Sequence, residues 1–256
     1  MKDFKNDRYY LLRYGILWTV VCLGASAQIL NLRGVDSSLS FTHFNLLYLL
    51  AAIPLLGPLS AIFHNSTHGS VGSKRVNFVV GEFLGLFFLY GHRNFKLGHL
   101  LHHRYTDDPD LDPDYRRHDT ISGFVAHQGS QAYHCVKTFY LRTFGENKST
   151  QFQIKLQGFV IGLSIISRLV FWYSLLGGKA FVLFYLPVAL GNLLIFTHIN
   201  FVTHSIGGTG MEVKNDPARG LQRYFDLMTF GGYHHHNHHQ RPGLFHHARI
   251  AGKVSV

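Results

Sequence analysis

Cysteines and acidic residues are scarce in this chain. Its 256 residues include two cysteines, and 14 aspartates and glutamates stand against 24 lysines and arginines. Two cysteines can neither build the disulfide framework of a small secreted protein nor ligate an iron–sulfur cluster, which takes about four. Cys22 lies in an apolar run and Cys135 in a polar stretch, so we expect two free thiols in a reducing compartment.

The chain also lacks the glycine-rich motifs that hold nucleotides. No G-x-G-x-x-G fingerprint stands between a strand and a helix, and no G-x4-G-K-[ST] loop is present. The formal net charge is +10, and the basic residues form no stripe but lie beside hydrophobic segments. This distribution favours an anionic membrane surface over nucleic acid as the partner.

Long apolar runs, by contrast, are abundant. A helix needs about 20 mainly apolar residues to cross a bilayer. Four runs meet this length: Tyr10–Leu32, Phe44–Phe63, Gly158–Leu176 and Ala180–Phe201. A fifth, Phe78–Tyr90, is too short and is interrupted by Glu82, so we expect a re-entrant or interfacial segment. The runs predict an all-α, multi-pass integral membrane protein of four transmembrane helices in two hairpins, with a cytosolic helical cap, as a single domain over residues 1–256.

The placement of basic residues predicts the orientation. Most lysines and arginines lie in the N-terminal tail, in Gly91–Gln151 and after His204, whereas Arg33–His43 and Gly177–Lys179 hold one each. Cytoplasmic segments carry the excess of basic residues. Four spans with both termini in the cytoplasm place every basic segment on that side, together with most histidines.

Nineteen histidines are present, and most fall into three clusters beside apolar runs. Neutral imidazole is a good ligand for iron, zinc, copper or nickel. Histidines three or four residues apart share one face of a helix, so each cluster can bind one metal centre. The candidate ligands in the three clusters are His64 and His68, then His99, His102 and His103, then His235, His238 and His239.

The third cluster is ambiguous because it holds five histidines within six residues. At about 100° per residue in a helix, His235 falls between His238 and His239, whereas His234 and His236 lie on opposite flanks. We therefore predict the first three as the ligands.

A fourth element, Asn200 and His204, stands one helical turn apart at the end of the last span and adds two candidate ligands. His198 is about half a turn from Asn200 and is interpreted as structural.

The order H-x3-H, H-x2-HH, H-x2-HH, with the first box after a helical hairpin, resembles the integral-membrane fatty acid desaturase and hydroxylase superfamily from about Phe63 to Phe245. The resemblance implies two iron ions, held by these boxes at the cytosolic ends of four spans, and dioxygen-dependent attack on unactivated C–H bonds of a lipid. Asn200-x3-His204 looks like the Asn-x3-His element of acyl-CoA desaturases. The extra His234 and His236 depart from the usual third box.

An acidic run follows the second box and includes Asp107, Asp108 and Asp110. Histidines that bind a metal usually donate their other N–H to a carboxylate or carbonyl. These aspartates, and Glu82, are candidates for that role. A solvated, proline-broken loop is the alternative for the run, and Glu82 can equally face the protein interior.

Together with these motifs, the resemblance implies a dioxygen-dependent di-iron oxidoreductase that acts on a lipid chain, foremost a fatty acyl desaturase. A carotenoid or alkyl hydroxylase or ketolase on the same scaffold is the alternative, because hydroxylation and desaturation both begin with hydrogen abstraction. A histidine-rich transition-metal transporter is the alternative from another class, although transporters bind their cargo near the bilayer midplane. We expect a fatty acyl or other lipid substrate, dioxygen, the membrane, and a separate electron donor of ferredoxin or cytochrome type with its reductase.

Overall fold

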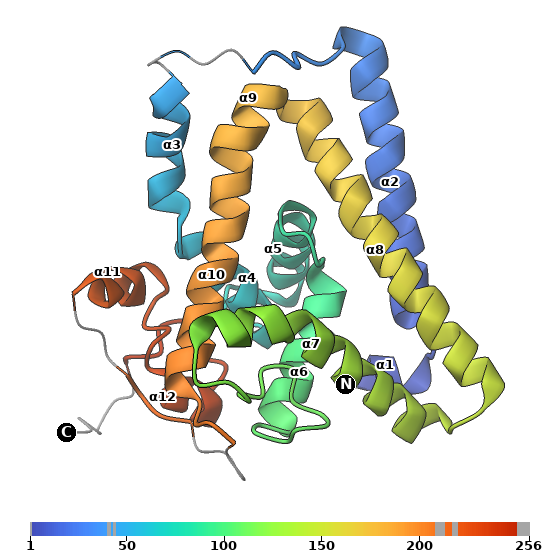
Figure 1. Ribbon diagram of the computed structural model, residues 1–256, viewed down its shortest axis with the longest axis vertical. Coiled ribbons are helices and arrows are strands. Elements are labelled where there is room, and N and C mark those ends of the chain that lie inside the picture. The colour runs from blue at the N-terminus through green and yellow to red at the C-terminus, as the bar shows by residue number, and fades with distance from the viewer. Residues whose placement is uncertain (1, 40–41, 43–44, 208–212, 217–219, 250–256) are drawn as a thin grey trace.

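The computed structural model describes residues 2–39, 42, 45–207, 213–216 and 220–249, and these residues fold into helices (Figure 1). No strand forms within these ranges, and one isolated antiparallel bridge joins His204 to Val213. Four helices in the described part are long and apolar enough to cross a membrane, which confirms the predicted fold class. They cover Tyr10–Arg33, Leu46–His68, Lys148–Leu176 and Gly178–Thr203.

The first and third of these helices, α2 (Tyr10–Arg33) and α8 (Lys148–Leu176), pack against each other. They form one arm of an inverted V, open at its lower end, whose other arm holds α3 (Leu46–Ala52) and α10 (Leu186–Thr203) (Figure 1). Gly15 permits the close approach of α2 to α8, because a Cβ there would lie 2.7 Å from Cγ1 of Val160. Cys22 of α2 is buried and free, as is Cys135, which confirms the two free thiols.

The second span is broken, whereas the sequence predicted one run from Phe44, a residue that lies outside the described ranges. The break follows from two prolines, which remove backbone donors, and from Gly57, whose φ is +103°. Asn192 of α10 replaces the lost partners: its Oδ1 accepts from the Gly57 and Ser60 N–H groups, and its Nδ2 donates to the Leu55 carbonyl. The resulting pieces are α3 (Leu46–Ala52), η2 (Ile53–Leu55) and α4 (Pro58–His68).

The fourth span is one continuous path with a local change of helix type. Pro187, near the start of α10, has no N–H to donate to the preceding turn. The turn before it accordingly widens into a single π-helical turn, the form in which the rare π-helix mostly occurs inside α-helices. The segments are α9 (Gly178–Ala180), the π-turn η3 (Phe181–Tyr185) and α10 (Leu186–Thr203).

The short apolar segment forms α5 (Lys74–Phe87), between the arms of the V (Figure 1). Its 14 residues are too few to cross a bilayer. Both arms bind the carbonyls at its C-terminal end: Trp172 of α8 donates to Leu86 and Tyr185 of η3 donates to Phe87. These bonds hold the turn that leads into the second histidine cluster.

That cluster lies on α6 (His92–Arg104), which is anchored by its opposite face. Leu97 and Leu101 are fully buried in an apolar cluster with Phe139 and Tyr140 of α7. Because these leucines occupy one side of the helix, its histidines lie on the other. The remaining helices are α1 (Lys2–Asn6), α7 (Ile121–Phe144), α11 (Leu221–Met228) and α12 (His235–Gln240).

Candidate metal centre

Nine histidines from four elements converge below the arms of the V. The elements are α4, α6, the end of α10 and α12, and the ring nitrogens within each group lie within 4.8 Å of one another. One group holds five side chains, His64, His68, His99, His103 and His238, and the other holds four, His102, His204, His235 and His239. The nine histidines identified in the sequence are thus all brought together, in two groups rather than one.

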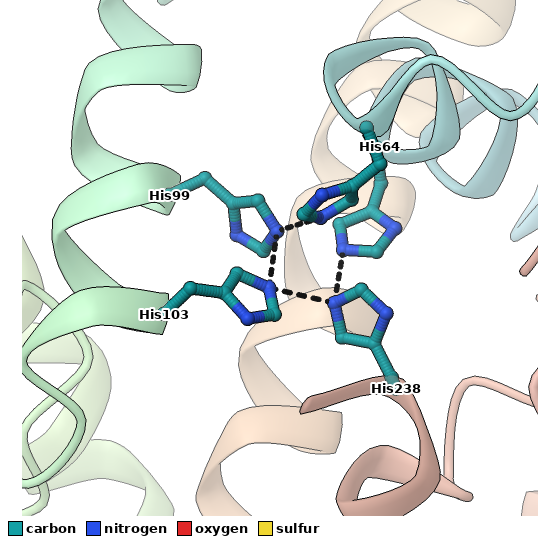
Figure 2. A group of neighbouring side chains, drawn as sticks. His64, His99, His103 and His238 are labelled. Carbon is teal, nitrogen blue, oxygen red and sulfur yellow. Dashed lines mark hydrogen bonds between the residues drawn. The ribbon is translucent and has the colours of Figure 1, made fainter. Parts of the chain in front are cut away.

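The first group has its ring nitrogens facing inward, as Figure 2 shows for four of its members. The Nε2 atom of His103 lies 3.0 Å from that of His99 and 2.8 Å from that of His238. His68 and His99 approach to 2.7 Å, and His64 and His238 to 3.1 Å, through the same atoms. Ligands at right angles around a metal about 2.1 Å away are separated by about 3.0 Å. The spacing therefore fits a shared metal ion.

In the second group, Nε2 of His239 lies 3.0 Å from Nε2 of His102 and 3.2 Å from Nε2 of His235. His204 completes it: its ring centroid is 4.9 Å from that of His102, and its buried Nε2 has no hydrogen-bond partner in the described part of the chain. A buried nitrogen without a partner is costly unless something absent from the chain binds it. A metal ion held by the group would satisfy this atom.

Two carboxylates fix the tautomer of two histidines in this second group. Asp112 Oδ1 lies 2.8 Å from Nδ1 of His102, and Asp107 Oδ1 lies 3.3 Å from Nδ1 of His204. A proton held on Nδ1 leaves the lone pair of Nε2 directed at the group. This arrangement is the one that metal-binding histidines commonly use.

Burial keeps most of these imidazoles neutral, as metal ligation requires. It lowers the pKa of His99, His235 and His238 well below the usual value, and neighbouring imidazoles lower it further. Burial and the same neighbours lower the pKa of His103 to about 2. His102 differs, because burial is outweighed by Asp112, which raises its pKa to about 9.

The other carboxylates singled out in the sequence lie elsewhere. Asp108 accepts from the N–H groups of Asp110 and Leu111 and therefore points into its own loop. The side chain of Asp110 is 53 % exposed, beside His134 and Arg142 on the surface. The sequence thus indicated the correct loop, but of the aspartates named from it only Asp107 contacts a histidine of the centre.

Glu82 belongs to a separate polar cluster at the start of α2. It accepts from Tyr14 at 3.0 Å, from Trp18 at 3.1 Å and from Arg93 at 3.3 Å. His92, whose Nδ1 lies 3.7 Å from Oε1 of Glu82, is outside both histidine groups. These contacts match the alternative that Glu82 faces the protein interior.

The third cluster folds in the helical register expected for it. His234 precedes α12, and its Nε2 lies 3.8 Å from Asp226. His236 points away from the groups, with Nδ1 donating to the Val213 carbonyl at 2.9 Å. His235 and His238 are buried among the gathered histidines.

The fourth element is divided between a histidine in the centre and an asparagine beside it. Asn200 is buried one turn before His204, and its carbonyl accepts the His204 N–H at 3.1 Å. Its role as a metal ligand stays a prediction. Nδ1 of His198 lies 2.8 Å from the Tyr233 hydroxyl, a contact typical of a structural histidine.

The spacing of histidines in the sequence did not identify one further histidine beside the centre, His247. It is buried, its ring centroid is 4.4 Å from that of His238, and neither ring nitrogen has a hydrogen-bond partner among the described residues. Burial lowers its pKa to about 4. It follows the Pro242–Gly243 turn at no helical spacing from the third box. Its position beside His238 therefore depends on how the chain folds back after that turn, which the sequence does not show.

Comparison with known protein families gives a match. The family model described as fatty acid desaturase matches residues 39–249, a range that includes all nine gathered histidines. No curated protein and no solved structure matches the chain.

Proposed function

The chain belongs to the fatty acid desaturase family, and we propose that it is a dioxygen-dependent di-iron desaturase of fatty acyl chains. Membership makes it a membrane oxidoreductase of the type that desaturates or hydroxylates lipids. The observation that carries the finer proposal is the convergence of nine imidazoles into two adjacent groups of five and four. Two groups from one cluster suit two metal ions at neighbouring positions.

Each proposed iron has its own set of histidines. His64, His68, His99, His103 and His238 would hold one ion, and His102, His204, His235 and His239 the other. When bound, two irons supply the activation of dioxygen and the oxidising power that an unactivated C–H bond requires. Asp107 and Asp112 hold the protons of His204 and His102 on Nδ1, which keeps both Nε2 atoms available.

Aromatic residues beside the first group suit an alkyl substrate. The ring of Phe95 stacks on His99 at 5.3 Å, and the ring of Phe196 lies 5.4 Å from that of His64. Apolar walls exclude water from the reacting position and leave a hydrocarbon chain in contact with the protein. The protein's part is therefore to orient the chain and keep the site dry.

The site and both chain termini are proposed to face the cytoplasm, because most basic residues flank that side of the spans. The whole sequence of 256 residues contains no nucleotide-binding fingerprint. We therefore propose that a separate ferredoxin or cytochrome with its reductase delivers the electrons, docking on the basic cytoplasmic surface.

Two measurements test the proposal. Anaerobically purified protein should contain two irons per chain, whereas stoichiometric zinc from iron-replete cells with activity retained would contradict the di-iron assignment. Mass spectrometry of lipids from expressing cells should show products that have lost two hydrogens and are absent with His103→Ala. The gain of one oxygen instead would identify a hydroxylase on the same scaffold.

A further inference from the structure

Outside the histidine groups, a hollow of about 500 Å³ is lined by Asp7, the start of α2, α5 and the first turn of α6. Leu17 and Phe78 form its apolar side and are 58 % and 52 % exposed. Because Leu17 belongs to a helix that can cross the membrane, lipid is the medium that these side chains face. The hollow thus lies where the bilayer meets the histidine-bearing end of the molecule.

The polar side of the hollow carries two ion pairs. Arg13 pairs with Asp7 at its rim, and Arg93 pairs with Glu82 deeper in. The charges of the four ionisable side chains in these two pairs therefore sum to zero. Such a lining gives no advantage to a multiply anionic ligand, which needs an excess of positive charge.

The two arginines keep donors for a ligand. The side chain of Arg13 is 65 % exposed, and Asp7 is its one hydrogen-bond partner among the described residues. Arg93 uses Nε for Glu82 and Nη1 for the hydroxyl of Tyr10, and its Nη2 has no acceptor in the described part of the chain. Guanidinium groups with free N–H donors are suited to phosphate.

Glu82 positions Arg93 rather than binding a ligand. Its carboxylate already accepts from Tyr14 and Trp18 as well as from Arg93. Asp7 is more open, with its side chain 28 % exposed at the rim. It is therefore the carboxylate available to an ammonium group.

We propose that this hollow binds the headgroup of a zwitterionic aminophospholipid from the surrounding bilayer. The phosphate lies on Arg13 and Arg93, the primary ammonium on Asp7, and the acyl chains along Leu17 and Phe78. A two-carbon ester joins phosphate and ammonium in such a headgroup, so the two groups can reach the neighbouring Arg13 and Asp7 together. Tyrosine and tryptophan, which also line the hollow, are enriched at this depth of a membrane.

The test measures which lipid stays with the full-length protein. The chain is reconstituted into nanodiscs of equal parts phosphatidylethanolamine and phosphatidylglycerol, and retained lipids are counted by native mass spectrometry after controlled delipidation. Wild-type protein should retain phosphatidylethanolamine in preference. Arg13→Gln should lower that retention about fivefold, the factor corresponding to about 1 kcal/mol per basic residue at a membrane surface. Arg93→Gln should act in the same direction.

The variant Asp7→Asn should change which lipid the protein retains rather than lower lipid retention. It removes the negative charge beside Arg13, so the lining becomes net positive and preference should move towards phosphatidylglycerol. Arg142→Gln is the matched control, because Arg142 of α7 is also an exposed arginine paired with an aspartate, Asp110, and neither residue lines the hollow. Its lipid retention should equal that of wild type.

Circular dichroism and monodisperse elution identify folded variants, and Arg13→Gln, at an exposed position, keeps the test open if Arg93→Gln misfolds. Wild-type retention of phosphatidylethanolamine by folded Arg13→Gln would overturn the proposal. So would an unchanged selectivity of Asp7→Asn, or an equal loss in Arg142→Gln.

Discussion

Replacing Asp112 with asparagine tests whether a carboxylate behind the histidines supports metal binding. Asp112 is fully buried, and its Oδ1 lies 2.8 Å from Nδ1 of His102 and 2.8 Å from the N–H of Asp114. Its Oδ2 accepts the N–H of Asp107 at 2.8 Å. Asparagine retains one oxygen, so keeping the His102 contact turns an NH2 group towards the Asp107 N–H. Two donors then face each other in a buried site.

The size of the effect follows from these contacts. Leaving a buried donor without an acceptor costs about 1 to 3 kcal/mol of folding free energy. Losing the carboxylate behind a metal-binding histidine lowers metal affinity by about 10- to 100-fold. At about 1.4 kcal/mol per factor of ten, the second effect is about 1.4 to 2.8 kcal/mol of binding free energy. Because Asp112 contacts a histidine of the four-membered group alone, one of the two ions should be affected.

The assay is an anaerobic titration of metal-free protein with ferrous iron against a competing chelator. Asp112→Asn should weaken one of two binding events by about 10- to 100-fold and leave the other unchanged. Asp110→Asn is the control, since this aspartate is in the same loop with an exposed side chain near His134 and Arg142. The reasoning would be refuted if Asp112→Asn bound both iron ions with wild-type affinity. It would also be refuted if Asp110→Asn weakened iron binding as much as Asp112→Asn.

Three further predictions concern register, topology and electron supply. His235→Ala should abolish turnover and lower bound iron, whereas His236→Ala should keep substantial activity, because His236 bonds to Val213 and Gln240 outside the centre; iron loss confined to the second variant would contradict this. A single cysteine at Asp216 should react with an impermeant reagent from the cytoplasmic side, and labelling from the outer side alone would refute the topology. Repeated turnover should require an added reductase and carrier, so turnover by purified protein with oxygen and a reduced nicotinamide alone would contradict a separate donor.

Local spacing along the chain was enough to find the nine gathered histidines, although not His247 beside them. Within a helix, side chains three and four residues apart must share a face whatever the rest of the fold does. This rule selected His235 over His234 and His236 before any contact was known, and the structure has the same register. The length of the apolar runs likewise predicted four spans, because bilayer thickness sets the number of residues a helix needs.

Features that depend on turn geometry and on contacts between distant segments could not be predicted from the sequence. Asp107 adopts a positive φ of 65°, and the turn that follows directs Asp112 inward and Asp110 outward, an alternation that composition does not encode. The repair of the broken second span by Asn192 joins residues about 135 positions apart.

The division of the second box is decided in the same way. His99 and His103 enter one group and His102 the other, because α4 supplies the partners of the first group and the end of α10 that of the second, whereas α12 contributes to both. The sequence alone determined which side chains can ligate and which helix faces carry them, since both follow from spacing within a single helix. Tertiary packing decided which histidines gather into each group and which carboxylates contact them, since both depend on contacts between segments distant in the chain.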